Sequence, residues 1–171
     1  KDKINVIKGE SIVLSNDNST QNAVSISKGV RFEKVNPGAR ILIDDGRLSL
    51  EVKELVSNRT IDCVAIDDGF IENGKGVNFP GIALNVPVLT TQDEIDLNLS
   101  LSEEADWLAL SFVRSASDYQ FIKDKIKEAG YNPPIIAKIE KWEAVQNLEG
   151  IIHSFDAVMV ARGDLGVEMP L

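Results

Sequence analysis

The stretch AVMVARGDLGVE, at residues 157–168, changes from an apolar run to a polar, glycine-containing segment within a few positions. Residues 157–161 have the composition of a buried strand, and Arg162, Gly163 and Asp164 follow them directly. Because Asp and Gly favour turns, a buried strand that enters an ordinary loop would account for this stretch on its own. The rest of the chain favours a functional interpretation, since two further strands end in the same way.

The second half of the chain alternates apolar runs with amphipathic segments. The runs at 107–111, 135–139 and 157–161 predict buried strands. The segments at 116–129 and 142–153 predict helices, and a capping box at 91–94 predicts another helix before the first strand. This alternation is typical of βαβ units with a parallel sheet, whose ligand sites lie at the carboxyl ends of the strands.

Polar side chains occur at the carboxyl end of each predicted strand. They are Ser111 and Arg114 after the first strand, Lys138 and Glu140 in and after the second, and Arg162 and Asp164 after the third. Lys138 and Glu140 are two residues apart, so their side chains point to the same side of the strand. A surface ion pair would explain them on an edge strand, whereas a place in a central strand favours a functional site.

These residue types suit chemistry on an anionic substrate. Glu140 and Asp164 provide carboxylate oxygens of the kind that Mg²⁺ takes as ligands, with water and substrate oxygens in its remaining positions. Lys138 would then stabilise negative charge on a transferred phosphoryl group or on an enolate oxygen. Gly163 and Gly166 leave backbone amides accessible to a carboxylate or phosphate.

The first half of the chain has the pattern of a β-rich domain. Short alternating or β-branched runs occur at 4–7, 11–14, 24–26, 40–43, 48–52 and 61–66. Turn-forming residues separate these runs, and the tetrapeptide Ile-Asp-Asp-Gly, at 43–46 and again at 66–69, is interpreted as two hairpin turns. Many short strands within residues 1–80 predict a compact β-barrel or sandwich.

The composition limits the classes of partner. A formal net charge of −9 at pH 7 argues against a nucleic acid or an anionic membrane. An acidic chain can still bind anionic metabolites when a divalent cation supplies the positive charge. The single cysteine, Cys63, excludes a disulfide framework, and no apolar run approaches the length of a membrane span. Because residues 1–15 lack a secretion signal, we expect a cytoplasmic protein.

Four strings in the sequence resemble pyruvate kinase, in that family's order and spacing. They are GKGVNFPG at 74–81, ADWLALSFVR at 105–114, IIAKIE at 135–140 and VMVARGDLGVE at 158–168. The resemblance is loose over residues 1–40 and dense from Pro37 onward. It implies a (β/α)₈ TIM barrel with an inserted β-barrel lid domain. Residues 1–82 are similar to the lid, and residues 83–171 to the part of the barrel from its third helix to its sixth strand.

The resemblance also implies roles for individual residues. In the resemblance, Lys138 is a catalytic lysine supported by Ser111, and Glu140 and Asp164 are metal ligands. The substrate carboxylate would bind at Ala161, Arg162 and Gly163. Lys75 and Asp45 would be residues of the lid that face the nucleotide. The implied cofactors are Mg²⁺ or Mn²⁺, with K⁺ bound by residues of the full enzyme that this chain does not contain. The implied partners are phosphoenolpyruvate and pyruvate, ADP and ATP, and further copies of the protein in a homo-oligomer.

The sequence departs from the family at Lys141, since the family's motif usually continues there with Asn and then Glu-Gly. The resemblance implies part of a longer glycolytic enzyme that transfers phosphate from phosphoenolpyruvate to ADP, with the 171 residues inactive alone. Two alternatives are a Mg²⁺-dependent barrel lyase or aldolase that acts on a pyruvate enolate, and a non-catalytic binding module. Lys75 and the β-rich half favour the kinase over the lyase. The joint presence of Lys138, Glu140 and Asp164 favours an enzyme over a binding module.

Overall fold

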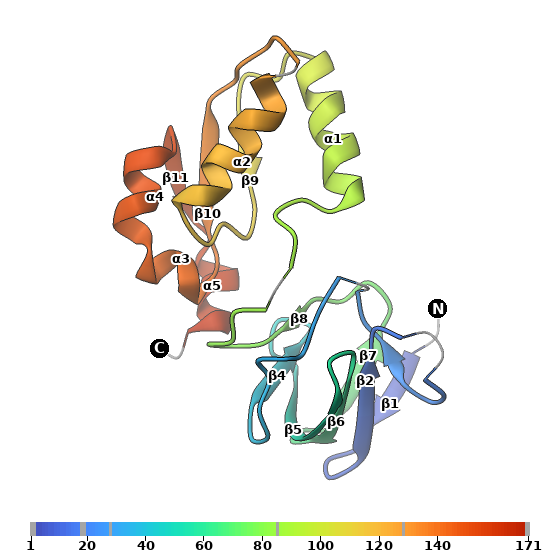
Figure 1. Cartoon of the computed structure of the whole chain (residues 1–171). Helices are drawn as coiled ribbons and strands as arrows, with labels where there is room; N and C mark the ends of the chain where they lie inside the picture. The colour runs from blue at the N-terminus through green and yellow to red at the C-terminus, as the bar shows by residue number, and fades with distance from the viewer. Residues whose placement is uncertain (1–2, 18–19, 28, 85, 128, 170–171) are drawn as a thin grey trace. The chain divides into compact units, whose positions relative to one another are not determined.

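The chain forms two compact units in the computed structural model (Figure 1), one of residues Lys1–Val86 and one of residues Pro87–Leu171. The structure describes residues 3–17, 20–27, 29–84, 86–127 and 129–169. We call the two units the β unit and the α/β unit. The division lies just after the boundary expected between residues 82 and 83. Among the described residues, no helix has the length and apolar character needed to cross a bilayer.

The described residues of the β unit form two sheets. Strands β1 (Lys3–Val6) and β7 (Gly69–Glu72) form an antiparallel pair. A six-stranded sheet has the order β3-β2-β6-β5-β4-β8, and its strands are β2 (Ser11–Ser15), β3 (Val24–Ser25), β4 (Arg40–Ile43), β5 (Leu48–Ser57), β6 (Thr60–Ala65) and β8 (Val77–Asn78). The six predicted strands are confirmed within a few residues, and β7 and β8 are additional to them.

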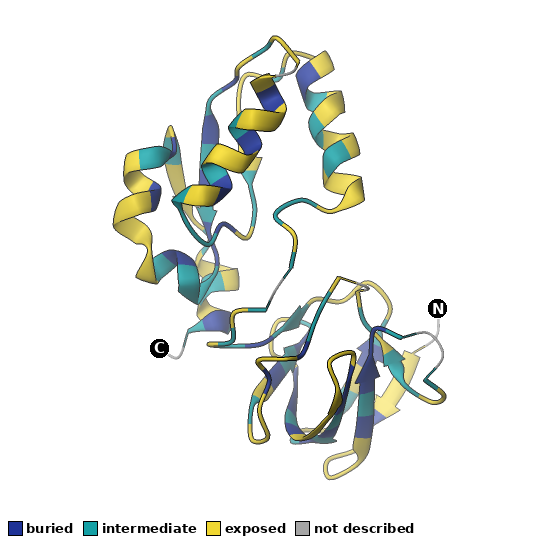
Figure 2. Ribbon diagram, viewed as in Figure 1, coloured by how far each residue is buried: buried dark blue, intermediate teal, exposed yellow. Residues whose placement is uncertain are grey.

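One hydrophobic core lies within the β unit. Alternate residues of β2, β4 and β6 are buried, as expected for strands with one face in a core, and Figure 2 shows these positions in dark blue. Val6 of β1 and Ile71 of β7 belong to the same cluster of buried residues, so both sheets contribute to it. The described strands therefore pack as two sheets around a shared core, and hydrogen bonds do not join them into one closed barrel.

The two Ile-Asp-Asp-Gly segments have different structural roles. Residues 43–46 connect β4 to β5, which pair antiparallel, so the predicted hairpin is confirmed there. Residues 66–69 connect β6 to β7, which lie in different sheets, so the hairpin prediction is wrong for this copy. The two copies also differ in backbone, since Asp44, Asp45 and Gly46 all have positive φ whereas Asp67, Asp68 and Gly69 do not. Pairing of the flanking strands with distant segments decides whether the turn closes a hairpin.

Cys63 lies in β6 and is fully buried in this core. Burial, with a smaller contribution from the charge of Asp62, raises the pKa of the thiol to about 12. At pH 8 we expect the native chain to react with dithiobis(nitrobenzoate) on the order of 10³-fold more slowly than the chain unfolded in guanidinium chloride, because both the thiolate fraction and its accessibility fall. Similar native and unfolded rates would show that β6 is not part of a stable core.

The α/β unit contains a parallel sheet with helices between its strands. Its elements are α1 (Thr91–Ser102), β9 (Leu108–Leu110), α2 (Ala116–Lys127), β10 (Ile135–Ile139), α3 (Trp142–Gln146), α4 (Leu148–Ser154), β11 (Ala157–Val160) and α5 (Arg162–Glu168). The strands lie in the order β11-β10-β9, and both pairings are parallel. The three βαβ strands predicted from the sequence are thus confirmed.

Three local features of this unit differ from the sequence-based expectations. The capping box is formed by Thr90 and Asp93, one residue earlier than expected, because the hydroxyl of Thr90 accepts from the backbone N–H of Asp93. The helix expected at 142–153 is divided at Asn147, whose side chain donates to the carbonyl oxygens of Arg114 and Glu143. The residues after β11 enter a short helix, α5, and not an ordinary loop.

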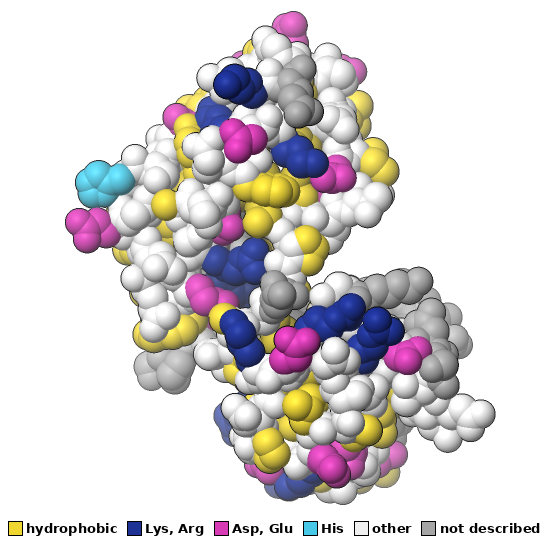
Figure 3. Space-filling model, in the orientation of Figure 1, with side chains coloured by type: hydrophobic (Ala, Val, Ile, Leu, Met, Phe, Trp, Pro, Cys, Tyr) yellow, Lys and Arg dark blue, Asp and Glu magenta, His cyan; other side chains and the backbone are white. Residues whose placement is uncertain are grey.

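The two faces of the parallel sheet have different environments. Ile135, Ala137 and Ile139 of β10 are buried in a core shared with α2 and α4. Lys138 points to the opposite face, beside Met159 of β11, and this face is only partly covered within the unit. Large hydrophobic side chains reach the surface of the unit, and some of them appear in yellow in Figure 3. The sheet therefore presents Lys138 on its more accessible face.

Candidate active site

Lys138, Glu140 and Ser111 form a cluster at the carboxyl ends of β9 and β10. The Nζ atom of Lys138 forms an ion pair with Oε1 of Glu140 and donates a hydrogen bond to Oγ of Ser111 over 3.1 Å. The side chain of Glu140 is 1% exposed and that of Lys138 is 26% exposed. The structure thus brings together three of the residues predicted from the sequence, and it leaves the Lys138 side chain partly exposed.

The carboxylate of Glu140 has a hydrogen-bond or ionic partner on each oxygen. Its Oε1 contacts Lys138, and its Oε2 accepts a hydrogen bond of 2.8 Å from the backbone N–H of Phe112. Burying a carboxylate is costly unless such partners replace the water it loses. The two contacts therefore explain how a glutamate lies at the end of a central strand, and they hold its orientation.

Phe112 is a residue of this site that the sequence analysis did not single out. It follows β9 with a φ of 56°, in the left-handed region that bulky residues rarely adopt. This conformation accompanies the hydrogen bond from its backbone N–H to Glu140, while its ring is 58% exposed. Such backbone conformations cost about 1–3 kcal/mol and tend to occur at functional sites. No sequence signal distinguishes Phe112 from an ordinary strand-end residue.

The four selected residues after β11 lie at the start of α5. Ala161 is the N-cap, Arg162 and Gly163 are the first two helical residues, and Asp164 is an exposed residue of the first turn. The backbone N–H of Ala161 donates to the carbonyl oxygen of Ile139 over 3.2 Å, so the ends of β10 and β11 remain adjacent at this point. Among the described residues, the Asp164 carboxylate makes no hydrogen bond or ion pair with a side chain.

A small hard cation is compatible with the donor atoms present. Within the described part of the chain, no three His, Cys, Asp or Glu side chains form a group that could hold a metal ion. Mg²⁺ does not require such a group, because it commonly takes one or two protein carboxylates and completes its shell with water and substrate oxygens. Glu140, directly after β10, and Asp164, in the first turn of the helix that follows the neighbouring strand β11, provide oxygen donors of this kind.

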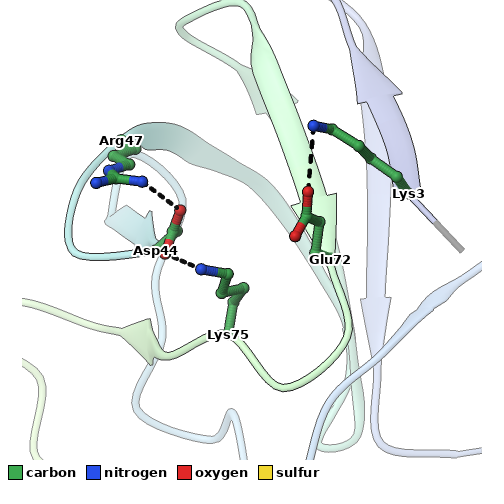
Figure 4. A network of polar contacts seen from close by, with 5 residues as sticks. All are labelled: Lys3, Asp44, Arg47, Glu72 and Lys75. Carbon is green, nitrogen blue, oxygen red and sulfur yellow. Dashed lines mark hydrogen bonds and ion pairs between the residues drawn. The ribbon is translucent and has the colours of Figure 1, made fainter. Parts of the chain in front are cut away.

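A second charged cluster lies in the β unit (Figure 4). The Nζ atom of Lys75 contacts Oδ1 of Asp44 over 2.9 Å, and Nη1 of Arg47 contacts Oδ2 of the same carboxylate over 3.5 Å. The hydrogen bond from Lys75 lowers the pKa of Asp44, and the same bond raises the pKa of Lys75. Each group therefore stabilises the charged form of the other.

The sequence points to Asp45 together with Lys75, but the structure pairs Lys75 with Asp44. Asp44 and Asp45 both have positive φ values, 52° and 56°, in the turn between β4 and β5. In this turn Asp44 is half-buried and points toward Lys75, whereas Asp45 is exposed. Neighbouring aspartates in a turn cannot be told apart from sequence, because the contact depends on a loop thirty-one residues away.

Comparison with known proteins points to one family. Residues 1–171 match a family model described as pyruvate kinase, barrel domain. Pyruvate kinase 2 of Synechocystis sp. is 46% identical over 152 residues, which cover 88% of this chain and 26% of that protein. Pyruvate kinase of Corynebacterium glutamicum is 43% identical over 165 residues, which cover 95% of this chain and 34% of that protein. The chain thus spans about a quarter to a third of the length of these curated relatives.

Proposed function

The chain belongs to the pyruvate kinase family, and from this premise we propose that it forms part of the catalytic centre of a pyruvate kinase. In glycolysis the whole enzyme would transfer phosphate from phosphoenolpyruvate to ADP and give pyruvate and ATP. The observation that carries the proposal is the cluster of Lys138, Glu140 and Ser111 at the carboxyl ends of two parallel strands. This edge is where α/β folds bind their ligands.

In this proposal Lys138 is the catalytic residue. Its side chain is partly exposed, and it lies on the sheet face opposite the core that β10 shares with the helices. It would stabilise charge on the transferred phosphoryl group and then on the enolate oxygen of pyruvate. The hydrogen bond to Ser111 and the ion pair with Glu140 restrict the rotamers of the lysine. Such restriction suits phosphoryl transfer, which depends mainly on positioning and electrostatic stabilisation.

The remaining residues would bind the substrates and a metal ion. Glu140 and Asp164 would hold Mg²⁺ or Mn²⁺, which when bound neutralises charge on the phosphoryl oxygens. Backbone amides at 161–163 would bind the carboxylate of phosphoenolpyruvate. In the β unit, Lys75 and Asp45 would face the nucleotide. The ammonium of Lys75 suits the phosphates of ADP, and its pairing with Asp44 stabilises its charge.

We also propose the wider context that the resemblance implies. The α/β unit would form the part of a (β/α)₈ barrel from its third helix to its sixth strand, and the β unit would be the inserted lid. The whole enzyme would be a cytoplasmic homo-oligomer that uses K⁺ as well as a divalent cation. The relatives reported above are all named pyruvate kinase, so the lyase or aldolase alternative receives no support from them.

The function is tested by following ATP formation from phosphoenolpyruvate and ADP in the full-length enzyme as Mg²⁺ is varied. We expect activity in the full-length enzyme and none in the 171-residue chain alone, because the orienting parts of the site are incomplete there. Asp164→Ala should raise the Mg²⁺ concentration needed for half-maximal activity at least about tenfold, because a carboxylate ligand is lost.

The matched control for this experiment is Asp106→Ala. Asp106 is an exposed aspartate that precedes β9, so it lies at the amino ends of the strands, opposite the candidate site. Its loss should leave the Mg²⁺ dependence unchanged. A full-length enzyme that forms no ATP would contradict the proposed function. Equal Mg²⁺ dependence in the two variants would contradict the assignment of Asp164 as a metal ligand, and ATP formation by the isolated chain would contradict its expected inactivity.

A further inference from the structure

Lys141 follows the site residue Glu140 directly and begins helix α3 as its N-cap. N-cap positions favour residues whose side chains accept a hydrogen bond from the helix, and a lysine ammonium has no acceptor. In agreement with this, the side chain of Lys141 makes no capping hydrogen bond. A local helix-capping role therefore does not explain the residue, which is also the point where the sequence departs from the usual family motif.

The side chain of Lys141 instead forms an ion pair with Glu168, the last residue of α5. The side chain of Glu168 is only 3% exposed, whereas that of Lys141 is 23% exposed. A carboxylate at that depth needs a charged or hydrogen-bonding partner to offset its desolvation. The pair thus joins the segment after β10 to the carboxyl end of the helix that contains Asp164.

Helix α5 depends on such contacts for its position. It has seven residues, and helices of this length are not stable in isolation. Its contacts with the rest of the unit include Leu165, which packs against the hydrophobic core, and Glu168. Leu165 and Glu168 lie about one helical turn apart. Their two contacts together therefore fix the rotation of α5 about its axis and its distance from the rest of the α/β unit.

The same ammonium group also lies near the strained residue at the end of β9. The Nζ atom of Lys141 is 5.5 Å from the centroid of the Phe112 ring, within the range of a cation–π contact. The backbone N–H of Phe112 donates to Glu140. Lys141 therefore contacts two segments at once, the turn that orients Glu140 and the helix that contains Asp164.

We propose that Lys141 is a positioning residue, which sets α5, and with it Asp164, relative to Glu140 through the ion pair with Glu168. The inference deepens the proposed function, because it assumes that Glu140 and Asp164 bind the same metal ion. Lys141 itself does not contact the metal or the substrate. Lys141 acts on the site through its contacts with Glu168 and Phe112. Its role can therefore be tested without catalysis, by measuring metal binding and the stability of α5.

The test compares Lys141→Met with the parent chain in two measurements that need no substrate. Mn²⁺ binding is followed by water-proton relaxation, and we expect affinity to fall about tenfold, as is usual when a residue that orients metal ligands is removed. Amide hydrogen exchange is followed along α5, and we expect faster exchange at 165–169 with little change in β10, because the backbone N–H groups of Leu165 and Met169 donate hydrogen bonds within this helix. Glu168→Gln keeps the size of the side chain and should give a similar but smaller effect.

The matched control is Lys125→Met, which removes a lysine from a 2.7 Å ion pair with Glu94 in the same unit, where both side chains are more than 40% exposed. It should alter neither measurement, and Lys141→Arg should preserve both. If the parent chain binds no Mn²⁺, the assignment of Glu140 and Asp164 as metal ligands fails. In that case the positioning role of Lys141 is judged by hydrogen exchange alone, and unchanged exchange of α5 in Lys141→Met and Glu168→Gln overturns it. Unchanged α5 exchange in both variants, with parent-like Mn²⁺ binding, overturns the inference alone.

Discussion

Replacing Lys138 with Met in the full-length enzyme is expected to reduce turnover by at least about 10²–10³-fold, the usual cost of removing one group that stabilises developing negative charge. Met has a similar length but no charge, so the substrates would still fit while the phosphoryl and enolate oxygens lose a cation. The effect should appear in kcat measured at saturating phosphoenolpyruvate and ADP. Turnover within a few-fold of the parent enzyme would show that Lys138 is not the catalytic lysine.

The structure adds a second expectation for the same variant. Without Lys138, the buried carboxylate of Glu140 keeps the hydrogen bond from Phe112 but loses its cation. Because Lys138 is partly exposed, we expect a moderate loss of about 1–3 kcal/mol in the unfolding free energy of the metal-free α/β unit. Lys127→Met, which removes an exposed lysine from the last turn of α2, is the control and should change neither turnover nor stability.

Replacing Phe32 with Ala is expected to destabilise the β unit by about 3–5 kcal/mol, the range for deleting a large buried aromatic side chain. Phe32 is fully buried although it lies in a loop, and its ring centroid is 5.9 Å from that of Phe79. Removing it would leave a cavity and lose the ring contact. Phe70→Ala is the control, because that ring is 51% exposed, and about 1 kcal/mol or less is expected there.

The two units can be followed separately in this experiment. Both tryptophans, Trp107 and Trp142, lie in the α/β unit, whereas the only cysteine, Cys63, lies in the core of the β unit. Thiol labelling across a urea series therefore reports unfolding of the β unit, and tryptophan fluorescence reports unfolding of the α/β unit. Phe32→Ala should lower the urea midpoint of labelling and leave that of fluorescence in place. An unchanged labelling midpoint would mean that Phe32 is not part of the core.

The order of the parallel sheet was predictable from the sequence because its determinants are local. Each strand of the α/β unit is a short apolar run, and each connection contains a helix-forming segment. Short connections of this kind place successive strands side by side, so the order β9, β10 and β11 follows directly. The spacing of two residues also places Lys138 and Glu140 on the same side of the strand. Ser111 lies close to them because the carboxyl ends of parallel strands lie together.

The sequence by itself therefore determined a β-rich half followed by a parallel α/β half, and the group of strand-end residues from which the candidate site is built. Tertiary structure alone decided the contacts between residues far apart in the chain: the pairing of Lys75 with Asp44 and not Asp45, the use of the second Ile-Asp-Asp-Gly segment as a link between sheets, and the pairing of Lys141 with Glu168. The left-handed conformation of Phe112 belongs to the same group. The physical reason is that periodicity and turn propensity act over a few residues, whereas a buried charge or a strained backbone is stabilised by whichever distant groups the completed fold brings to it.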